Sequence, residues 1–154
     1  MHRFYWLIED ALAGCSRPGA GGGDLDHDLH ELRGHGIGAL LTLTETPLTV
    51  GALERHGLRG LHLPVDDFHA PTTGQMLDAL AFIDDARAEG LAVAVHCLAG
   101  QGRTGTVLAA YLIRGGLPAI KAIESVRAVC SRAIEATPQT EALSVWAVER
   151  PWLI

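Results

Sequence analysis

The chain has 154 residues, a length that fits one domain with a sizeable core. Its hydrophobic fraction of 48% and charged fraction of 19% are those of an ordinary globular protein and exclude a disordered chain. The formal net charge of −6 gives no electrostatic reason to expect nucleic acid as a partner, because nucleic-acid-binding proteins usually present a basic face. A single domain over residues 1–154 is therefore expected.

The cysteines and the N-terminal sequence bear on the compartment. Three cysteines, an odd number without paired spacing, argue against a disulfide framework and against a zinc site built from CxxC pairs. Glu9 and Asp10 stand where a signal peptide would continue its apolar run, and no apolar stretch approaches the ~18 residues that cross a bilayer. We therefore expect a cytoplasmic protein without membrane contact, whose free thiols stay reduced.

Hydrophobic patterning and turn residues predict the elements of the first half of the chain. Residues 4–8 are typical of a short strand, and the glycine-rich residues 13–23 are typical of a loop. A helix capped by Asp24 is predicted next, and it ends near Gly34 to Gly36. It is followed by a buried strand over 38–44, a short helix over 49–56 and a strand over 58–65.

The sequence of the second half of the chain predicts one strand and several helices. A helix is predicted over 73–89, and the continuous apolar run 91–95 predicts a strand that is covered on both faces. Helices are predicted over 104–114, from 118 to about 131, and over 137–149. Strands that alternate with helices indicate an α/β fold with a central, mainly parallel sheet of about four to five strands flanked by helices.

The loop after the strand 91–95 carries the strongest functional signal. It reads His96-Cys97-Leu98-Ala99-Gly100-Gln101-Gly102-Arg103-Thr104. Between a strand and a helix, successive backbone N–H groups point into the loop, and the helix N-terminus adds its positive end. The result is a cradle for phosphate or another tetrahedral oxyanion, and its glycines let the backbone approach the anion closely.

Two side chains distinguish this cradle from a nucleotide-binding loop, which would end in a Lys-Ser or Lys-Thr pair. Arg103 closes the loop six positions after Cys97, and its planar guanidinium can hold two phosphate oxygens. The same positive field favours the thiolate form of Cys97, which is the form that acts as a nucleophile. Cys15 and Cys130 have no arginine at this spacing and are expected to be packing residues. The alternative for Cys97 is a small buried cysteine at a strand end.

The run His96-Cys97, five residues, Arg103-Thr104-Gly105 resembles the signature of the protein tyrosine phosphatase superfamily. From about residue 4 to residue 149 the chain resembles the small, atypical dual-specificity members. The resemblance implies a protein tyrosine phosphatase-like fold and a protein-tyrosine or dual-specificity phosphatase that needs no metal and no cofactor. It also implies a phosphorylated protein as substrate, with phosphotyrosine favoured. We expect a monomer.

The resemblance also implies a carboxylic acid that protonates the leaving oxygen and later acts as base on water. The family pattern fits Asp67 best, because Phe68 follows it and Pro71 lies four residues on. Asp66 is the alternative, since an insertion of one residue would exchange the two. Both could also be solvated loop carboxylates.

Three supporting residues follow from the same resemblance. Thr104 has a hydroxyl that could hydrogen-bond the Cys97 sulfur and help it to depart, or it is an ordinary first-turn helix residue. His96 is expected to order the loop rather than to react. Gln139 matches a glutamine that positions the hydrolytic water in some relatives, or it is only a polar residue at a helix start.

Two alternative functions remain open. The same chemistry could act on a phosphoinositide, an inositol phosphate or an RNA 5′-phosphate. Relatives that act on lipids and inositides often place lysines in the loop, and none lies between Cys97 and Arg103, which favours a phosphoprotein. A non-catalytic phosphate-binding module would usually lack the cysteine or the arginine, and this chain has both.

Overall fold

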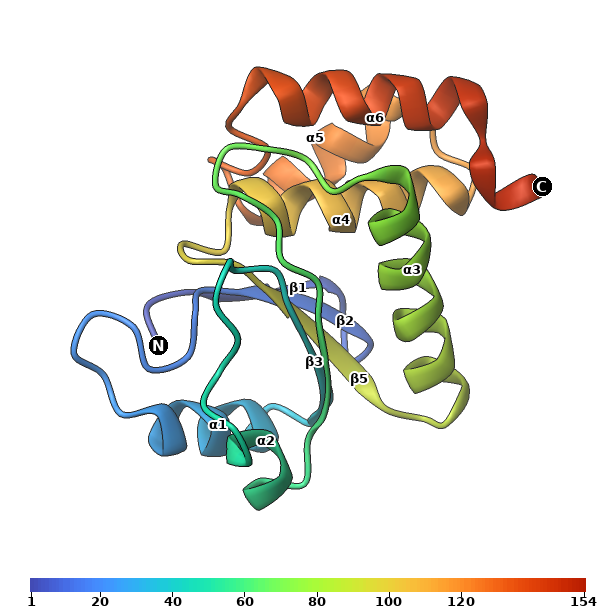
Figure 1. Cartoon of the computed structure of the whole chain (residues 1–154). Coiled ribbons are helices and arrows are strands. Elements are labelled where there is room, and N and C mark those ends of the chain that lie inside the picture. Colours follow the sequence, from blue (N-terminus) through green and yellow to red (C-terminus); the bar gives the residue numbers. More distant parts are fainter.

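The computed structural model describes all 154 residues, which surround a five-stranded sheet of order β1-β2-β5-β3-β4 (Figure 1). The strands are β1 (Phe4–Ile8), β2 (Leu12–Cys15), β3 (Ile37–Thr42), β4 (Arg59–His62) and β5 (Ala92–His96). Only the β1–β2 pair is antiparallel. The predicted α/β fold with a mainly parallel sheet is confirmed.

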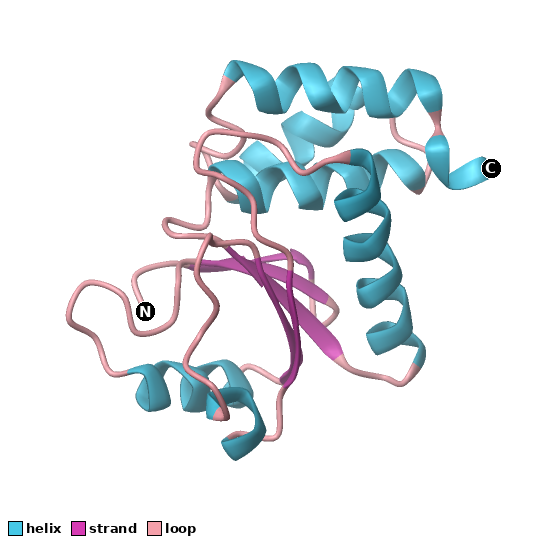
Figure 2. Cartoon of the chain, viewed as in Figure 1, coloured by secondary structure: helices cyan, strands magenta, loops and turns pink.

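Helices cover both faces of this sheet (Figures 1 and 2). One face carries α1 (Leu25–Gly34) and the short α2 (Ala52–Arg55). The other face carries α3 (Thr73–Ala88), α4 (Gly102–Arg114), α5 (Ala119–Val129) and α6 (Thr137–Glu149), and the chain ends in a 3-10 turn, η1 (Pro151–Leu153).

Two hydrophobic clusters, one on each face, explain the apolar sequence of the central strand. Val93 and Val95 of β5 belong to a cluster of 26 buried residues, and Ala92 and Ala94 belong to a cluster of 11. Since successive side chains of a strand point to opposite faces, a strand between two such layers has to be apolar at every position.

The loop predicted over residues 13–23 is wrong at its start, because Leu12–Cys15 forms β2. All four residues of β2 are buried, and the strand pairs with β1 on one side and β5 on the other. Gly14 serves close packing and not a turn: a Cβ at this position would lie 2.4 Å from the Tyr5 ring. The strand has only four residues, one of them a glycine, and Pro18 with the glycines from Gly19 onward dominates the local pattern.

The other predicted elements are present, most of them with shifted ends. The helix over 137–149 agrees at both ends, and Asp24 caps α1 by accepting from the His27 N–H at 3.3 Å. The strand predicted over 38–44 begins one residue earlier and ends two residues earlier, as β3, and the strand predicted over 58–65 is shorter, as β4. The helices predicted over 49–56 and 118–131 are shorter, as α2 and α5.

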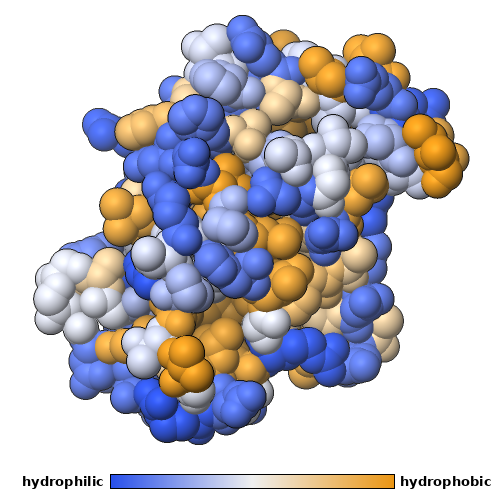
Figure 3. All heavy atoms as spheres, viewed as in Figure 1, coloured by the Kyte–Doolittle hydropathy of each residue, from blue (hydrophilic) through white to orange (hydrophobic).

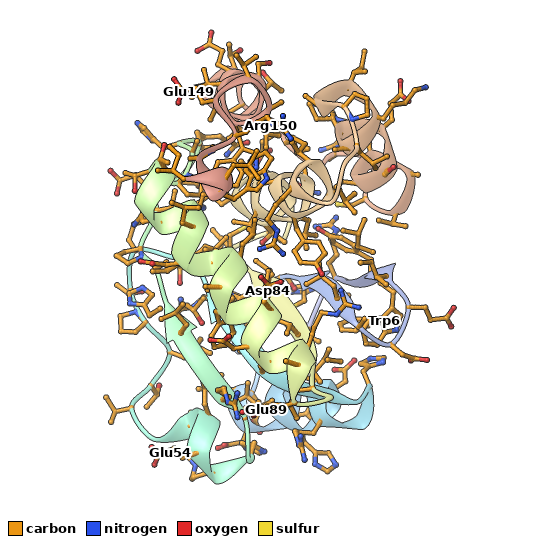
Figure 4. The ribbon with its side chains drawn as sticks, turned by 90° about the vertical axis from the view of Figure 1, so that its right-hand side faces the viewer. Trp6, Glu54, Asp84, Glu89, Glu149 and Arg150 are labelled. Atoms are coloured by element: carbon orange, nitrogen blue, oxygen red, sulfur yellow. The ribbon has the colours of Figure 1, made fainter.

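An ion pair joins two helices of the layer on one face of the sheet. Arg114 of α4 donates two hydrogen bonds of 2.6 Å to Asp84 of α3, which is labelled in Figure 4. Figure 4 also shows Trp6 of β1 and Glu54 of α2 on opposite sides of the molecule. These contacts hold α4, which begins directly after the loop that contains Cys97, against α3.

A cavity of about 600 Å³ lies between α2, β4 and the loop after β3. Its apolar lining includes Leu48, Leu53, Leu58 and Leu61, and Figure 3 shows hydrophobic atoms in this lower part of the molecule. None of the predicted catalytic residues lines it. No helix is long and apolar enough to cross a membrane.

Two positions on α6 test the larger core. Leu143 is fully buried, whereas Val148 is 81% exposed on the same helix. Leu143→Ala is expected to lower the free energy of unfolding by about 2–5 kcal/mol, because it leaves a cavity. Val148→Ala should change it by less than about 0.5 kcal/mol. Urea unfolding measures both, and equal losses would contradict the packing described for α6.

Candidate active site

Three loops that follow parallel strands meet at one edge of the sheet. They are the loop after β5, which contains Cys97, the loop after β3 and the loop after β4 (Figure 1). The carboxyl ends of parallel strands lie at the same edge, where open α/β sheets usually bind their ligands. Arg103 at the start of α4 contacts both other loops, so the three form one site.

The peptide groups of the loop after β5 share one orientation. The carbonyls of residues 97–101 all accept hydrogen bonds from groups outside the cradle, and the N–H groups of residues 98–102 donate to no other protein group. The donors to these five carbonyls, in chain order, are His96 Nδ1 (3.0 Å), Arg17 N (2.9 Å), Arg3 Nη1 (2.7 Å), Tyr5 Oη (2.7 Å), and Gly105 N (3.0 Å) with Ile134 N (3.2 Å). An array of free N–H groups is a suitable cradle for an anion.

Cys97 lies at the base of this cradle with only 3% of its surface exposed. The Thr104 hydroxyl donates to the Cys97 Sγ at 3.1 Å, which is the contact expected of a residue that stabilises a thiolate. The two other cysteines are also free and buried. Burial raises the pKa of the Cys15 thiol far above its ordinary value, so Cys15 stays protonated and unreactive.

His96 is fully buried and connects the loop to β3. Its Nδ1 contacts the Cys97 carbonyl and its Nε2 lies 2.8 Å from the Thr42 hydroxyl. Burial lowers the pKa of His96 to about 4, so the ring is neutral at pH 7. A neutral ring has one proton, which Nδ1 must donate to the carbonyl, while Nε2 accepts from Thr42. This geometry supports the expectation that His96 orders the loop.

Arg103 is 2% exposed and is held from one side. Its Nη1 donates to Glu45 Oε1 at 2.6 Å and to the Val65 carbonyl at 2.8 Å, and its Nη2 lies 3.4 Å from Asp67 Oδ1. The Nε is the one buried side-chain nitrogen or oxygen without a partner. An unsatisfied buried donor needs an explanation, and an oxyanion in the cradle supplies one.

Glu45 is a site residue that the sequence did not indicate. It follows β3, and besides Arg103 it accepts from the Asp67 N–H at 3.4 Å. Its own backbone N–H and the Arg103 guanidinium hold the pKa of Glu45 below its ordinary value. The carboxylate is half exposed and 58 residues from Arg103 in sequence, so no local pattern marks it.

The structure distinguishes the two candidate acids. Asp67 points to the site: its Oδ1 accepts from the Phe68 N–H at 3.0 Å and lies beside Arg103 Nη2. Asp66 is exposed, and its carboxylate makes no hydrogen bond or ion pair. Phe68 has a φ of 63°, so the chain bends sharply just after Asp67. The geometry therefore favours Asp67.

Gln139 joins the loop that carries Asp67 to the start of α6. It is fully buried, its Nε2 donates to the His69 carbonyl at 3.1 Å and its Oε1 accepts from the Ala136 N–H at 3.2 Å. Both ends of its amide are thus engaged in positioning the backbone. A role in orienting water stays a prediction.

Comparison with known proteins agrees with this geometry. Residues 13–117 match the family model described as "Polymorphic toxin system, DSP-PTPase phosphatase". The chain belongs to this family of phosphatases. The expectation of a small dual-specificity-like member of the protein tyrosine phosphatase superfamily is thereby confirmed.

Relatives in sequence and structure extend the comparison. Mouse (Mus musculus) dual specificity protein phosphatase 12 is 38% identical over 101 residues, which are 64% of this chain and 30% of that protein. The crystal structure of a mutant form of Tk-PTP is 32% identical with a TM-score of 0.84, covering 97% of both chains. PTPMT1 in complex with PI(5)P has the same TM-score at 24% identity, covering 98% of this chain and 99% of that one, and shows the shared fold. The chain spans less than two thirds of the length of the curated relatives that it matches.

His96 predicts how stability depends on pH. Its pKa is lowered in the folded state, so the unfolded chain binds the proton more tightly and stability falls as pH drops from 6.5 towards 4. Between these values wild type should lose about 3 kcal/mol more than His96→Asn. His30→Asn, at an exposed position of α1, is the control and should follow wild type. Urea unfolding across this pH range measures the difference, and parallel curves for wild type and His96→Asn would contradict the buried neutral ring.

Proposed function

We propose that this chain is a phosphomonoester hydrolase of the protein-tyrosine or dual-specificity type, acting through a cysteinyl-phosphate intermediate. The observation that supports it most is the meeting of Cys97, the free N–H groups of residues 98–102 and the unpartnered Arg103 Nε in one cradle. Asp67 stands on the loop across from them. Nucleophile, anion site and acid are thus within one site, as a two-step displacement requires.

In the first step the Cys97 thiolate attacks phosphorus in line, the S–P bond forms and the ester P–O bond breaks. The loop N–H groups and Arg103 stabilise the charge on the equatorial oxygens. Asp67 gives its proton to the leaving oxygen. Since Asp67 lies beside Arg103 Nη2, an arriving phosphate takes over this guanidinium edge and leaves the carboxyl group to face the leaving oxygen.

In the second step water attacks the phosphorus of the cysteinyl-phosphate while Asp67 takes its proton. The S–P bond breaks, inorganic phosphate forms and the thiolate returns. The Thr104 hydroxyl, 3.1 Å from the sulfur, stabilises the departing thiolate. Gln139 would assist the water only by releasing one of its two backbone partners. The proposed steps use no metal and no cofactor.

A phosphorylated protein is the proposed substrate, with phosphotyrosine favoured. The loop has no lysine, and the neighbouring Leu98 and Phe68 expose apolar side chains, at 52% and 56%, that suit an aromatic group. The inositide alternative rests on the fold shared with PTPMT1, which binds PI(5)P.

A reducing cytoplasm is the proposed compartment because the nucleophile is a free thiol. The family description makes a polymorphic toxin system a further proposed setting.

Hydrolysis of p-nitrophenyl phosphate in EDTA tests the chemistry. Cys97→Ser should abolish turnover, and Asp67→Asn should lower kcat by about 10²–10⁴-fold, because it removes the proton donor. Asp66→Asn is the matched control and should stay close to wild type. Turnover by Cys97→Ser would exclude the proposed nucleophile, and a larger loss in Asp66→Asn than in Asp67→Asn would reassign the acid.

Substrate preference is measured separately, as kcat/KM on phosphotyrosine, phosphothreonine and inositide substrates. We expect the phosphotyrosine peptide to be hydrolysed most efficiently. Phe68→Ala should lower kcat/KM for this peptide more than for the phosphothreonine peptide, because an exposed ring stacks on an aryl group. An inositide with the highest kcat/KM would contradict the proposed substrate.

A further inference from the structure

Two peptide groups at the tip of the phosphate loop are held by side chains from the N-terminal end of the chain. The Arg3 guanidinium donates from Nη1 to the Ala99 carbonyl at 2.7 Å, and the Tyr5 hydroxyl donates to the Gly100 carbonyl at 2.7 Å. These partners are 96 and 95 residues apart in sequence. The other loop carbonyls are tied by His96 or by backbone N–H groups.

The direction of a carbonyl fixes the direction of the next N–H. In a trans peptide the C=O of one residue and the N–H of the following residue point in opposite directions, and the chain has no cis peptide bond. Holding the Ala99 carbonyl outward therefore turns the Gly100 N–H towards the anion. Holding the Gly100 carbonyl outward does the same for the Gln101 N–H.

The peptide between Gly100 and Gln101 needs such an external tie more than its neighbours do. Gly100 has a φ of +76°, and a glycine passes between backbone conformations at little cost, so its own backbone does little to hold the peptide plane and an outside partner is needed. A larger residue cannot replace it, because a Cβ would lie 2.6 Å from the Cys15 backbone. The loop therefore requires a flexible glycine, Gly100, directly before the Gln101 N–H that must point towards the anion.

Tyr5 is itself fixed. It is 8% exposed, and its ring lies against Gly14, where the missing side chain makes the room. Burial raises the pKa of Tyr5 far above its ordinary value, so the hydroxyl remains a neutral donor throughout the working pH range. The Cys130 thiol lies 3.9 Å from the same carbonyl and is the weaker donor.

We propose that Tyr5 and Arg3 are positioning residues of the phosphate loop: they hold the Gly100 and Ala99 carbonyls outward and so aim the Gln101 and Gly100 N–H groups at the phosphate. The inference rests on the proposed function of the loop. It assigns to β1 and the residue before it a part in binding the substrate phosphate, although neither residue touches the phosphate.

Tyr5→Phe is the direct test, because it keeps the ring against Gly14 and removes only the hydroxyl. Without the hydroxyl, the Gln101 N–H is no longer held towards the anion, and its hydrogen bond to the anion is lost. Loss of this one hydrogen bond to a charged ligand should raise the Ki of the competitive inhibitor vanadate and the KM for p-nitrophenyl phosphate, each about tenfold. The change in kcat should be smaller, because the N–H binds the ground state and the transition state alike. Tyr111→Phe is the control: its hydroxyl contacts Arg87 at a distance from the loop, and its vanadate Ki should equal that of wild type.

Arg3 gives an independent variant pair. Arg3→Met should weaken vanadate binding, and Arg3→Lys, which retains a charged donor, should restore part of it. Thermal unfolding of each variant shows whether the fold is intact, and a merely structural role would move the midpoint without moving Ki.

The outcomes separate this inference from the proposed function. An active wild type with an unchanged vanadate Ki in both Tyr5→Phe and Arg3→Met overturns the inference alone. A wild type that neither binds vanadate nor hydrolyses p-nitrophenyl phosphate overturns the proposed function and the inference together.

Discussion

A backbone segment that binds an anion must turn its N–H groups towards the ligand and find other partners for its carbonyls. Residues 97–101 meet this constraint with hydrogen bonds from five separate parts of the chain: the start of the chain at Arg3 and Tyr5, Arg17 after β2, His96 at the end of β5, Gly105 in the first turn of α4, and Ile134 between α5 and α6. The antiparallel β1–β2 pair thus does more than widen the sheet, because it brings Arg3, Tyr5 and the Arg17 backbone to the outside of the loop. The loop has its orientation before any ligand arrives.

The second constraint is the buried charge of Arg103. An unpaired charge in a protein interior is costly, so a guanidinium that must be ready for phosphate needs partners that leave one edge open. Glu45 and the Val65 carbonyl share Nη1 and fix the plane of the group, while Nε stays unpartnered. Since Glu45 also accepts from the Asp67 N–H, the same carboxylate links Arg103 to the loop that carries Asp67. The residues proposed for phosphate binding and for proton transfer therefore belong to one connected group.

The sequence predicted the parts of this arrangement that lie close together along the chain. Cys97, Arg103 and Thr104 share one strand–loop–helix segment, whose spacing and glycines are visible in the sequence, and the apolar run before them predicts a strand between two layers. β2 was missed because it is only four residues long, contains Gly14, and is followed closely by Pro18 and Gly19, which are typical of a loop. Glu45, Arg3 and Tyr5 could not be predicted, since each acts on a residue 58 to 96 positions away and carries no local pattern. The choice of Asp67 over Asp66 was open in the sequence, and the geometry favours it through the contact with Arg103.

The central claim is that the cradle delivers phosphate to the sulfur of Cys97. It is tested most directly by rapid quenching of the Asp67→Asn variant during turnover of an aryl phosphate with a good leaving group, followed by peptide mass spectrometry. Loss of the base slows hydrolysis of the intermediate, so the account predicts a phosphate on the peptide that contains Cys97 and nowhere else. A phosphate on another residue, or rapid turnover with no phosphorylated peptide at any quench time, would contradict it.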